Sequence, residues 1–165
     1  MKKGKICGYD DETFEGAVGK ILTKKRLTIA VAESCTGGLL ADRLTDISGS
    51  SKYFMSGVIA YSDESKANML GVFPDSIKRY GAVSKQVALE MAKGIKHFAC
   101  VDIGLSITGI AGPTGGTKAK PVGLVYVAFV TDKKRIVREF RFKGSRQEIK
   151  FQASQAALDI IRYNI

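Results

Sequence analysis

Blocks of apolar and polar residues along the chain predict helices and strands in alternation. Helical spacing of apolar residues marks the segments 11–25, 38–47, 62–70, 84–98 and 145–161. Continuous or alternating apolar runs predict strands at 27–32, 57–61, 102–108, 122–130 and 135–142. This order predicts one three-layer α/β/α domain with a mixed, mostly parallel sheet, because a hairpin at 132–134 joins the last two strands.

Capping residues and apolar stripes support the later helices. Ser62 is a suitable N-cap, and Ser145 with Glu148 has the spacing of a capping box. The helix that opens at Ser84 is expected to turn four apolar side chains inward: Val87, Met91, Ile95 and Phe98. The buried side of the final helix is expected to carry Ile149, Ala153, Ala156, Ile160 and Ile161.

Length and composition fit one globular domain, residues 1–165. Of the 165 residues, 45% are hydrophobic and 25% are charged, which suffices for an ordinary core. The start of the chain lacks the apolar region of a signal peptide, and no run approaches the roughly 20 apolar residues of a membrane helix. Cys7, Cys35 and Cys100 are widely spaced, as reduced thiols are. We therefore expect a cytoplasmic protein without a membrane partner.

The net charge of +10 raises the question of nucleic-acid binding. The basic residues are dispersed along strand and helix patterns, and no nucleic-acid motif accompanies them. We therefore expect a solvated basic face that attracts a small anionic substrate, and we do not expect nucleic acid as a partner.

The segment from Leu27 to Gly38 changes abruptly from apolar residues to small, hydroxyl-bearing and glycine residues. It predicts a strand, a tight turn at Ser34 and the start of a helix. The backbone N–H groups of Thr36, Gly37 and Gly38 are expected to be free for a ligand. Two interpretations remain open: a serine nucleophile beside an anion, or a phosphate-binding or helix-capping turn without chemistry.

A serine nucleophile needs a base, and lysine is the available choice. The single histidine, His97, lies at the end of an amphipathic helix, where a surface or capping role is expected. Lys66 lies one turn into the helix after Ser62. Its pKa would have to fall from about 10.4 to roughly 7 or 8, which requires burial and requires Asp63 and Glu64 to face solvent. An ordinary solvated lysine is the alternative.

The loop from Gly109 to Gly116 is the most glycine-rich of the chain. It matches neither common nucleotide-binding glycine pattern, so neither ATP nor a dinucleotide is indicated. The loop is interpreted either as a ligand loop with free N–H donors or as an irregular connection. No group of carboxylates, cysteines or histidines has metal-ligand spacing, so we predict no metal and no cofactor.

Several motifs in one order closely resemble the CinA carboxy-terminal domain family, over about residues 12 to 160. They are residues 32–38 (AESCTGG), 49–51 (GSS), Tyr61 with Lys66, 70–72 (LGV), 81–84 (GAVS), 108–113 (TGIAGP) and 120–123 (KPVG). Stand-alone PncC members of this family are nicotinamide-nucleotide amidohydrolases, which convert nicotinamide mononucleotide to nicotinate mononucleotide and ammonia. The resemblance also implies an α/β/α fold and a homo-oligomer.

The resemblance implies roles for individual residues. The family serine falls on Ser34 and the family lysine base on Lys66, with Tyr61 as a helper of proton transfer. Oxyanion and substrate contacts are implied for Thr36, Gly37, Gly38, Thr108, Gly109, Ala111 and Gly112.

The chain departs from the family pattern at Ser56, Thr114 and Leu124. We expect Ser56 and Thr114 to border the site and to alter substrate fit. Two alternatives to a Ser34 amidase are kept: a binding module that holds a pyridine nucleotide or a protein without turnover, and an enzyme with Cys35 as its nucleophile.

Overall fold

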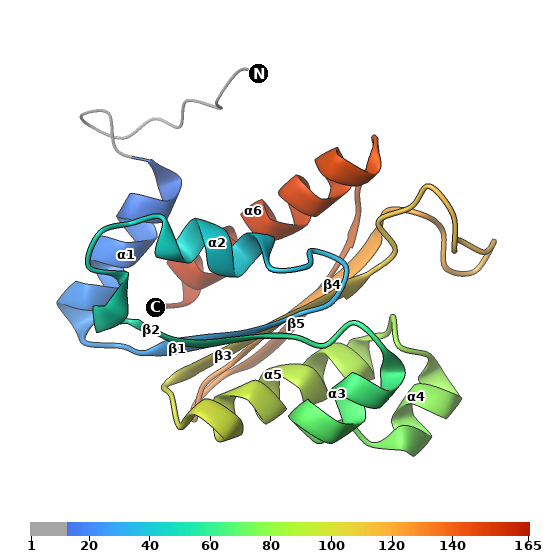
Figure 1. The fold of residues 1–165 in the computed structure, drawn as a ribbon, viewed down its shortest axis with the longest axis horizontal. Coiled ribbons are helices and arrows are strands. Elements are labelled where there is room, and N and C mark those ends of the chain that lie inside the picture. The colour runs from blue at the N-terminus through green and yellow to red at the C-terminus, as the bar shows by residue number, and fades with distance from the viewer. Residues whose placement is uncertain (1–12) are drawn as a thin grey trace.

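The structure is a computed structural model that describes residues 13–165, which form six helices, one short 3₁₀ helix and five strands (Figure 1). The helices are α1 (Phe14–Lys25), α2 (Leu39–Thr45), α3 (Asp63–Leu70), α4 (Pro74–Tyr80), α5 (Lys85–Ala99) and α6 (Arg146–Asn164), with the 3₁₀ helix η1 at Ser50–Lys52. The strands are β1 (Ile29–Glu33), β2 (Phe54–Ile59), β3 (Ile103–Gly109), β4 (Leu124–Val130) and β5 (Arg135–Arg141). Cys7 lies outside the described residues.

The five strands form one sheet in the order β2-β1-β3-β4-β5. β1 pairs in parallel with both β2 and β3, whereas β4 runs antiparallel to its neighbours β3 and β5. Four strands therefore point one way and β4 points the other. The carboxyl ends of β1, β2 and β3 share one edge of the sheet, where open α/β sheets bind ligands.

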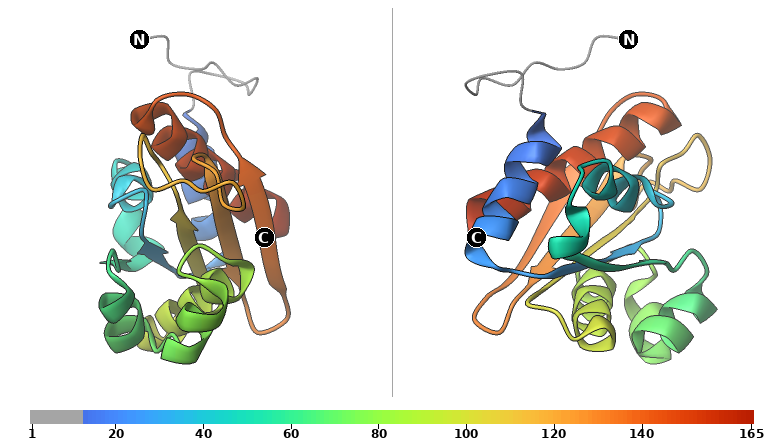
Figure 2. Two further views of the ribbon diagram at one scale, coloured as in Figure 1. Left: turned by 90° about the vertical axis from the view of Figure 1, so that its right-hand side faces the viewer. Right: turned by 60° about the vertical axis from the view of Figure 1, so that its left-hand side comes forward.

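Helices cover both faces of the sheet, so the α/β/α prediction is confirmed. Figure 1 shows α1, α2 and α6 on one side and α3, α4 and α5 on the other, and the turned views of Figure 2 agree. The side chains of β1 divide between two cores: Ile29 and Val31 pack with α1, α2 and α6, and Ala30 and Ala32 pack with α3 and α5. A continuous apolar strand buried on both faces is the expected pattern.

Close packing fixes α5 on the sheet. A side chain at Gly104 of β3 would collide with the backbone of Ala92 and with Lys96 on α5. Glycine therefore lets the helix approach the strand directly.

The predicted caps are confirmed, and one inward position is wrong. The hydroxyl of Ser62 accepts from Ser65 N–H at 3.0 Å, and Ser145 with Glu148 forms the capping box. Phe98 is 64% exposed, contrary to the prediction. The next apolar contact of α5 is made four residues beyond Ile95 by the partly buried Ala99, because that step keeps to the face set by Val87, Met91 and Ile95.

Strand and helix boundaries differ from the sequence prediction by a few residues. β2 begins at Phe54, three residues before the predicted start, and α4 was not predicted at all. Pro74, at the first position of α4, is the sequence signal for the start of this helix, and the spacing of apolar residues does not show it. Within residues 13–165, no helix has both the length and the apolar character needed to cross a membrane.

Candidate active site

The end of β1 is fixed by the buried carboxylate of Glu33. One carboxylate oxygen accepts from Gly38 N–H and Leu40 N–H, both at 3.1 Å, and the other accepts from Ala41 N–H at 2.8 Å. These donors belong to the first turn of α2, so a negative charge lies against the positive end of the helix. Glu33 is 1% exposed. It therefore holds the adjacent Ser34 turn in one conformation, a role that the sequence analysis missed.

The N–H groups of the turn are not all free, contrary to the prediction. Gly37 N–H donates to Ser34 O at 3.1 Å, and Gly38 N–H is bound to Glu33. In the described part of the chain, the Thr36 N–H has no acceptor. Of the three donors that were expected to be free, only the Thr36 N–H therefore is. Gly37 and Gly38 keep a conformational role, since both have positive φ, 62° and 99°.

The hydroxyl of Thr36 is buried without a partner. Thr36 is fully buried, and its Oγ1 is the one buried side-chain polar atom of residues 13–165 that lacks a hydrogen bond. An unpaired buried hydroxyl costs free energy, so its presence needs an explanation. It lies two residues after Ser34, in the turn where a ligand group is expected.

Lys66 is buried in the first part of α3, the helix that follows β2, and β2 is the strand next to β1. The side chain is 1% exposed, and its Nζ lies 3.0 Å from Tyr61 O and 3.4 Å from Ser62 O. Burial lowers the pKa of Lys66, whereas the charges of Asp63 and of a Cys35 thiolate raise it. The requirement of a buried lysine is thus met. Asp63 and Glu64 are both exposed, as required, although the charge of Asp63 still raises the pKa of Lys66.

Cys35 lies beside these groups as a buried thiol. Burial raises its pKa to about 12, and the charge of Glu33 acts in the same direction. Arg146 and Lys150, both on α6, act in the opposite direction. The thiol is therefore protonated near neutral pH and is a weak nucleophile.

Arg146 joins two of the three loops at this edge. Its Nη2 donates to the Tyr61 hydroxyl at 2.9 Å, and its Nη1 donates to Gly112 O at 2.8 Å. The backbone carbonyl of Tyr61 thus accepts from Lys66 and its phenol oxygen accepts from Arg146. The Tyr61 side chain is exposed. The sequence analysis could not assign Arg146 a role, because the helix that carries it is remote in sequence from both loops.

The connection after β3 supplies further backbone donors. The N–H groups of Ala111 and Gly112 have no acceptor within residues 13–165. Thr108 is buried, and its hydroxyl donates to Ala82 O at 2.9 Å, which ties β3 to the segment before α5. Gly109 pairs with Val125 of β4, where a side chain would approach Val125 too closely. Thr108 and Gly109 thus have structural contacts, whereas Ala111 and Gly112 carry free donors.

One predicted neighbour of the site lies away from it. Ser56 pairs with Ala30 in β2, three positions before Glu33, or about 10 Å along the strand. The expectation that Ser56 borders the site is therefore wrong, because Ser56 lies in the first half of β2 and the site lies at the carboxyl end of that strand. Thr114 lies exposed in the loop after β3.

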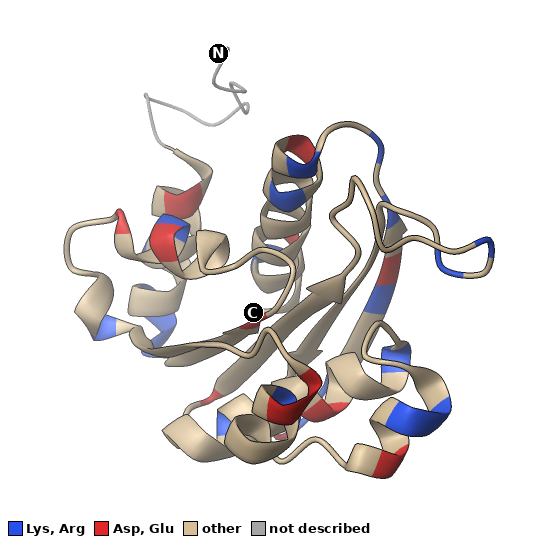
Figure 3. Ribbon diagram, turned by 45° about the vertical axis from the view of Figure 1, so that its right-hand side comes forward, with Lys and Arg blue, Asp and Glu red and all other residues tan. Residues whose placement is uncertain are grey.

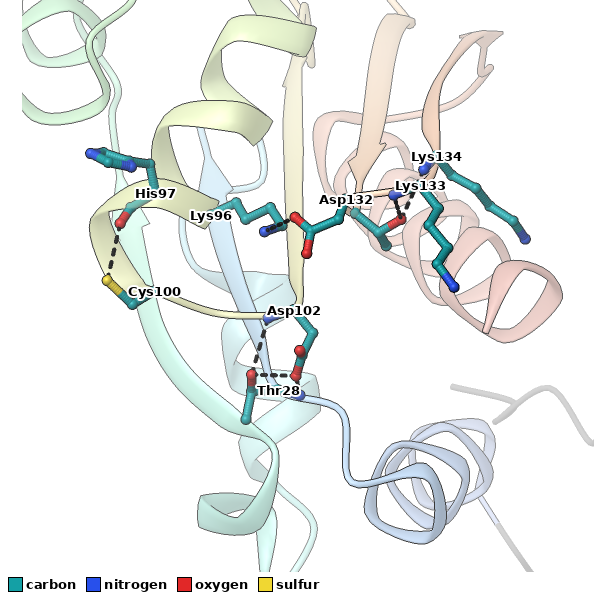
Figure 4. A network of polar contacts seen from close by, with 9 residues as sticks. Thr28, Lys96, His97, Cys100, Asp102, Asp132, Lys133 and Lys134 are labelled. Carbon is teal, nitrogen blue, oxygen red and sulfur yellow. Dashed lines mark hydrogen bonds and ion pairs between the residues drawn. The ribbon is translucent and has the colours of Figure 1, made fainter.

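The opposite edge of the sheet carries a separate set of polar contacts (Figure 4). There Thr28 and Asp102, which precede β1 and β3, bind one another through Oγ1 and Oδ2 at 2.8 Å. Lys96 pairs with Asp132 at 2.8 Å. A shallow hollow at this edge is lined by Lys93, Lys96, His97, Val130, Thr131, Asp132 and Arg135. His97 is exposed, as predicted.

Charged residues are spread over the surface, as Figure 3 shows for lysine and arginine on several elements. Residues 13–165 contain no group of three or more histidine, cysteine, aspartate or glutamate side chains that could hold a metal ion.

Comparison with known proteins agrees with the resemblance. The family model described as the CinA C-terminal domain matches residues 11–165. A competence-damage inducible protein of Thermoanaerobacter pseudethanolicus is 53% identical over 157 residues, and a CinA-like protein of Kosmotoga olearia is 50% identical over 157 residues. These matches cover 95% of this chain and 38% of each relative, so the chain spans less than half the length of these relatives.

Solved structures share the fold. The competence/damage inducible protein CihA of Agrobacterium tumefaciens has a TM-score of 0.89 at 37% identity, covering 91% of this chain and 92% of that one. A CinA superfamily protein of Escherichia coli has a TM-score of 0.88 at 31% identity, covering 97% and 95%.

Proposed function

Because the chain belongs to the CinA C-terminal domain family, we propose that it hydrolyses nicotinamide mononucleotide to nicotinate mononucleotide and ammonia. Ser34 is the nucleophile and Lys66 the general base. The observation that carries this proposal is the burial of Lys66, which lowers its pKa, on the strand-to-helix connection next to that of Ser34. A lysine that loses its proton more readily is suited to activate a hydroxyl.

The hydrogen bonds of Lys66 suit a neutral amine. A neutral lysine has two N–H groups and one lone pair. The carbonyls of Tyr61 and Ser62 accept two N–H groups, which leaves the lone pair to receive a proton. The backbone at the end of β2 therefore orients the base.

Acylation is the first step of the proposed reaction. Lys66 takes the hydroxyl proton of Ser34, and the Ser34 oxygen bonds to the carboxamide carbon of the substrate. The carbonyl oxygen gains the negative charge, and the free N–H groups of Thr36, Ala111 and Gly112 are its candidate donors. One such donor contributes on the order of 3 kcal/mol to the rate.

Collapse of this intermediate breaks the carbon–nitrogen bond. The Lys66 ammonium returns its proton to the leaving nitrogen, and ammonia departs. A nicotinoyl ester of Ser34 remains. Water, deprotonated by Lys66, then attacks the ester carbon, and the Ser34 oxygen leaves with the proton to restore the enzyme.

The test is product formation by the purified protein. Nicotinamide mononucleotide is supplied with a metal chelator present, and ammonia and nicotinate mononucleotide are both quantified. The proposal predicts equal amounts of the two products. Tight binding of the nucleotide by folded protein without either product would contradict the proposal and support the binding-module alternative.

A further inference from the structure

Lys150 is a cation without a counter-charge in the described part of the chain. It lies in the second turn of α6 and is half-buried. Within residues 13–165 its ammonium has neither a hydrogen-bond nor an ion-pair partner, whereas Arg43, Lys96 and Arg141 each pair with a carboxylate. A half-buried cation without a partner costs free energy, so an anionic ligand would gain by binding there.

The position of Lys150 relates it to the proposed nucleophile. A Cβ atom at Gly37 would lie 3.7 Å from Lys150 Nζ, so the ammonium stands directly over the Ser34 turn. Gly37 N–H in turn binds Ser34 O at 3.1 Å. Lys150 also counteracts the raised pKa of Cys35, which places its charge close to the residue between Ser34 and Thr36.

A second cation shares the same face of α6. Arg146 is four residues before Lys150, and residues at that spacing lie one above the other on a helix. Arg146 binds the Tyr61 hydroxyl and Gly112 O, so its guanidinium lies between the loop after β2 and the loop after β3. Lys150 differs from Arg146 because no group in the described chain accepts a hydrogen bond from its ammonium. The two cations make the active-site edge positively charged, and in the described chain the Lys150 ammonium is the one of the two without a hydrogen-bond acceptor.

We infer that Lys150 binds the phosphate of the substrate and sets the preference for a nucleotide over the corresponding nucleoside. The inference rests on the proposed function for the identity of the substrate. The phosphate accepts from the Lys150 ammonium above Gly37, while the carboxamide lies at Ser34. Glycine at position 37 is required by its positive φ of 62°, and a Cβ there would only reach ordinary contact distance from the ammonium.

The experiment compares Lys150→Met with Lys93→Met. Lys93 is an exposed lysine of α5, on the other face of the sheet from Lys150. Each variant loses one positive charge, but only Lys150→Met loses it beside the Ser34 turn. We expect Lys150→Met to raise the KM for nicotinamide mononucleotide about 10-fold and to leave the KM for nicotinamide riboside unchanged. Lys93→Met should match the wild type with both substrates. An equal effect of Lys150→Met on both substrates would overturn the inference.

Ribose 5-phosphate binding separates this inference from the proposed function, because it requires no turnover. Calorimetry should show binding to wild type and to Lys93→Met, and about 10-fold weaker binding to Lys150→Met and Lys150→Gln. If no variant releases ammonia but binding depends on Lys150, the proposed function fails and the phosphate site stands. Absence of ribose 5-phosphate binding to wild type, or equal binding by all variants, would overturn the phosphate site.

Discussion

The side-chain nitrogen of Lys66 lies 3.0 Å from the backbone carbonyl oxygen of Tyr61, where the chain leaves β2 and enters α3. The base is thus bound to the backbone of its own strand-to-helix connection. The carbonyl at the end of β2 fixes the direction of the amine, and the start of α3 directly afterwards buries the side chain and keeps it from water.

Asp63→Asn should shift the pH dependence of the reaction. The charge of Asp63 raises the pKa of Lys66, so its removal lowers that pKa and increases the neutral fraction of the amine. The rising limb of kcat/KM should move to lower pH. Glu64→Gln is the matched control, because it removes one charge from the same first turn of α3. An equal shift in both variants would show that the effect is a general one of helix charge.

Lys66→Met should abolish turnover and stabilise the fold. Burial lowers the Lys66 pKa below its ordinary value of 10.5, so the unfolded chain binds this proton more tightly than the folded protein. The burial therefore costs stability at neutral pH, and the cost declines as pH rises towards 10.5.

We expect a gain on the order of 1 kcal/mol in the free energy of unfolding of Lys66→Met near neutral pH. Thermal unfolding of both proteins across a pH series measures it. The difference between them should narrow at alkaline pH. A variant less stable than wild type at every pH would show that the two carbonyl hydrogen bonds outweigh the cost of burial.

Cys35 should resist alkylation while Cys100 reacts. Burial raises the Cys35 pKa to about 12, whereas Cys100 is exposed. Peptide mass spectrometry after iodoacetamide treatment at mildly alkaline pH should locate the label on Cys100 and leave Cys35 free. Denatured protein, in which both should react, is the control. Rapid labelling of Cys35 in the folded protein would restore the thiol as a candidate nucleophile.

Thr36→Val distinguishes a substrate contact from a packing residue. Valine keeps the shape of threonine and removes the unpaired buried hydroxyl, so the free protein should be as stable as wild type or more stable by up to about 1 kcal/mol. If the hydroxyl binds substrate, kcat/KM falls about 10-fold in the same variant. Unchanged kinetics would leave the hydroxyl without a function in substrate binding.

Much of the fold could be predicted from periodicity and caps. The capping box at Ser145 and the stripe of Val87, Met91 and Ile95 depend on local spacing, and the structure confirms both. The inward placement of Phe98 was wrong, because helical steps of three and of four residues after Ile95 fit the apolar pattern equally well.

The site could be predicted less fully, because its contacts join remote segments. Ser34 and Lys66 follow strands whose parallel pairing is predictable, but the contacts of Arg146 and Lys150 depend on how α6 crosses the sheet. Glu33 reads as the last residue of a strand, and its hydrogen bonds to α2 need three-dimensional coordinates. Cytoplasmic location and homo-oligomeric assembly stay predictions of the sequence.

The most direct test of the account is the rate of ammonia release from nicotinamide mononucleotide by Ser34→Ala beside Cys35→Ala, two adjacent substitutions of similar size. The account predicts loss of at least about 1000-fold in Ser34→Ala and a rate near that of wild type in Cys35→Ala. Retained activity in Ser34→Ala, with loss in Cys35→Ala, would contradict it and make the thiol the nucleophile.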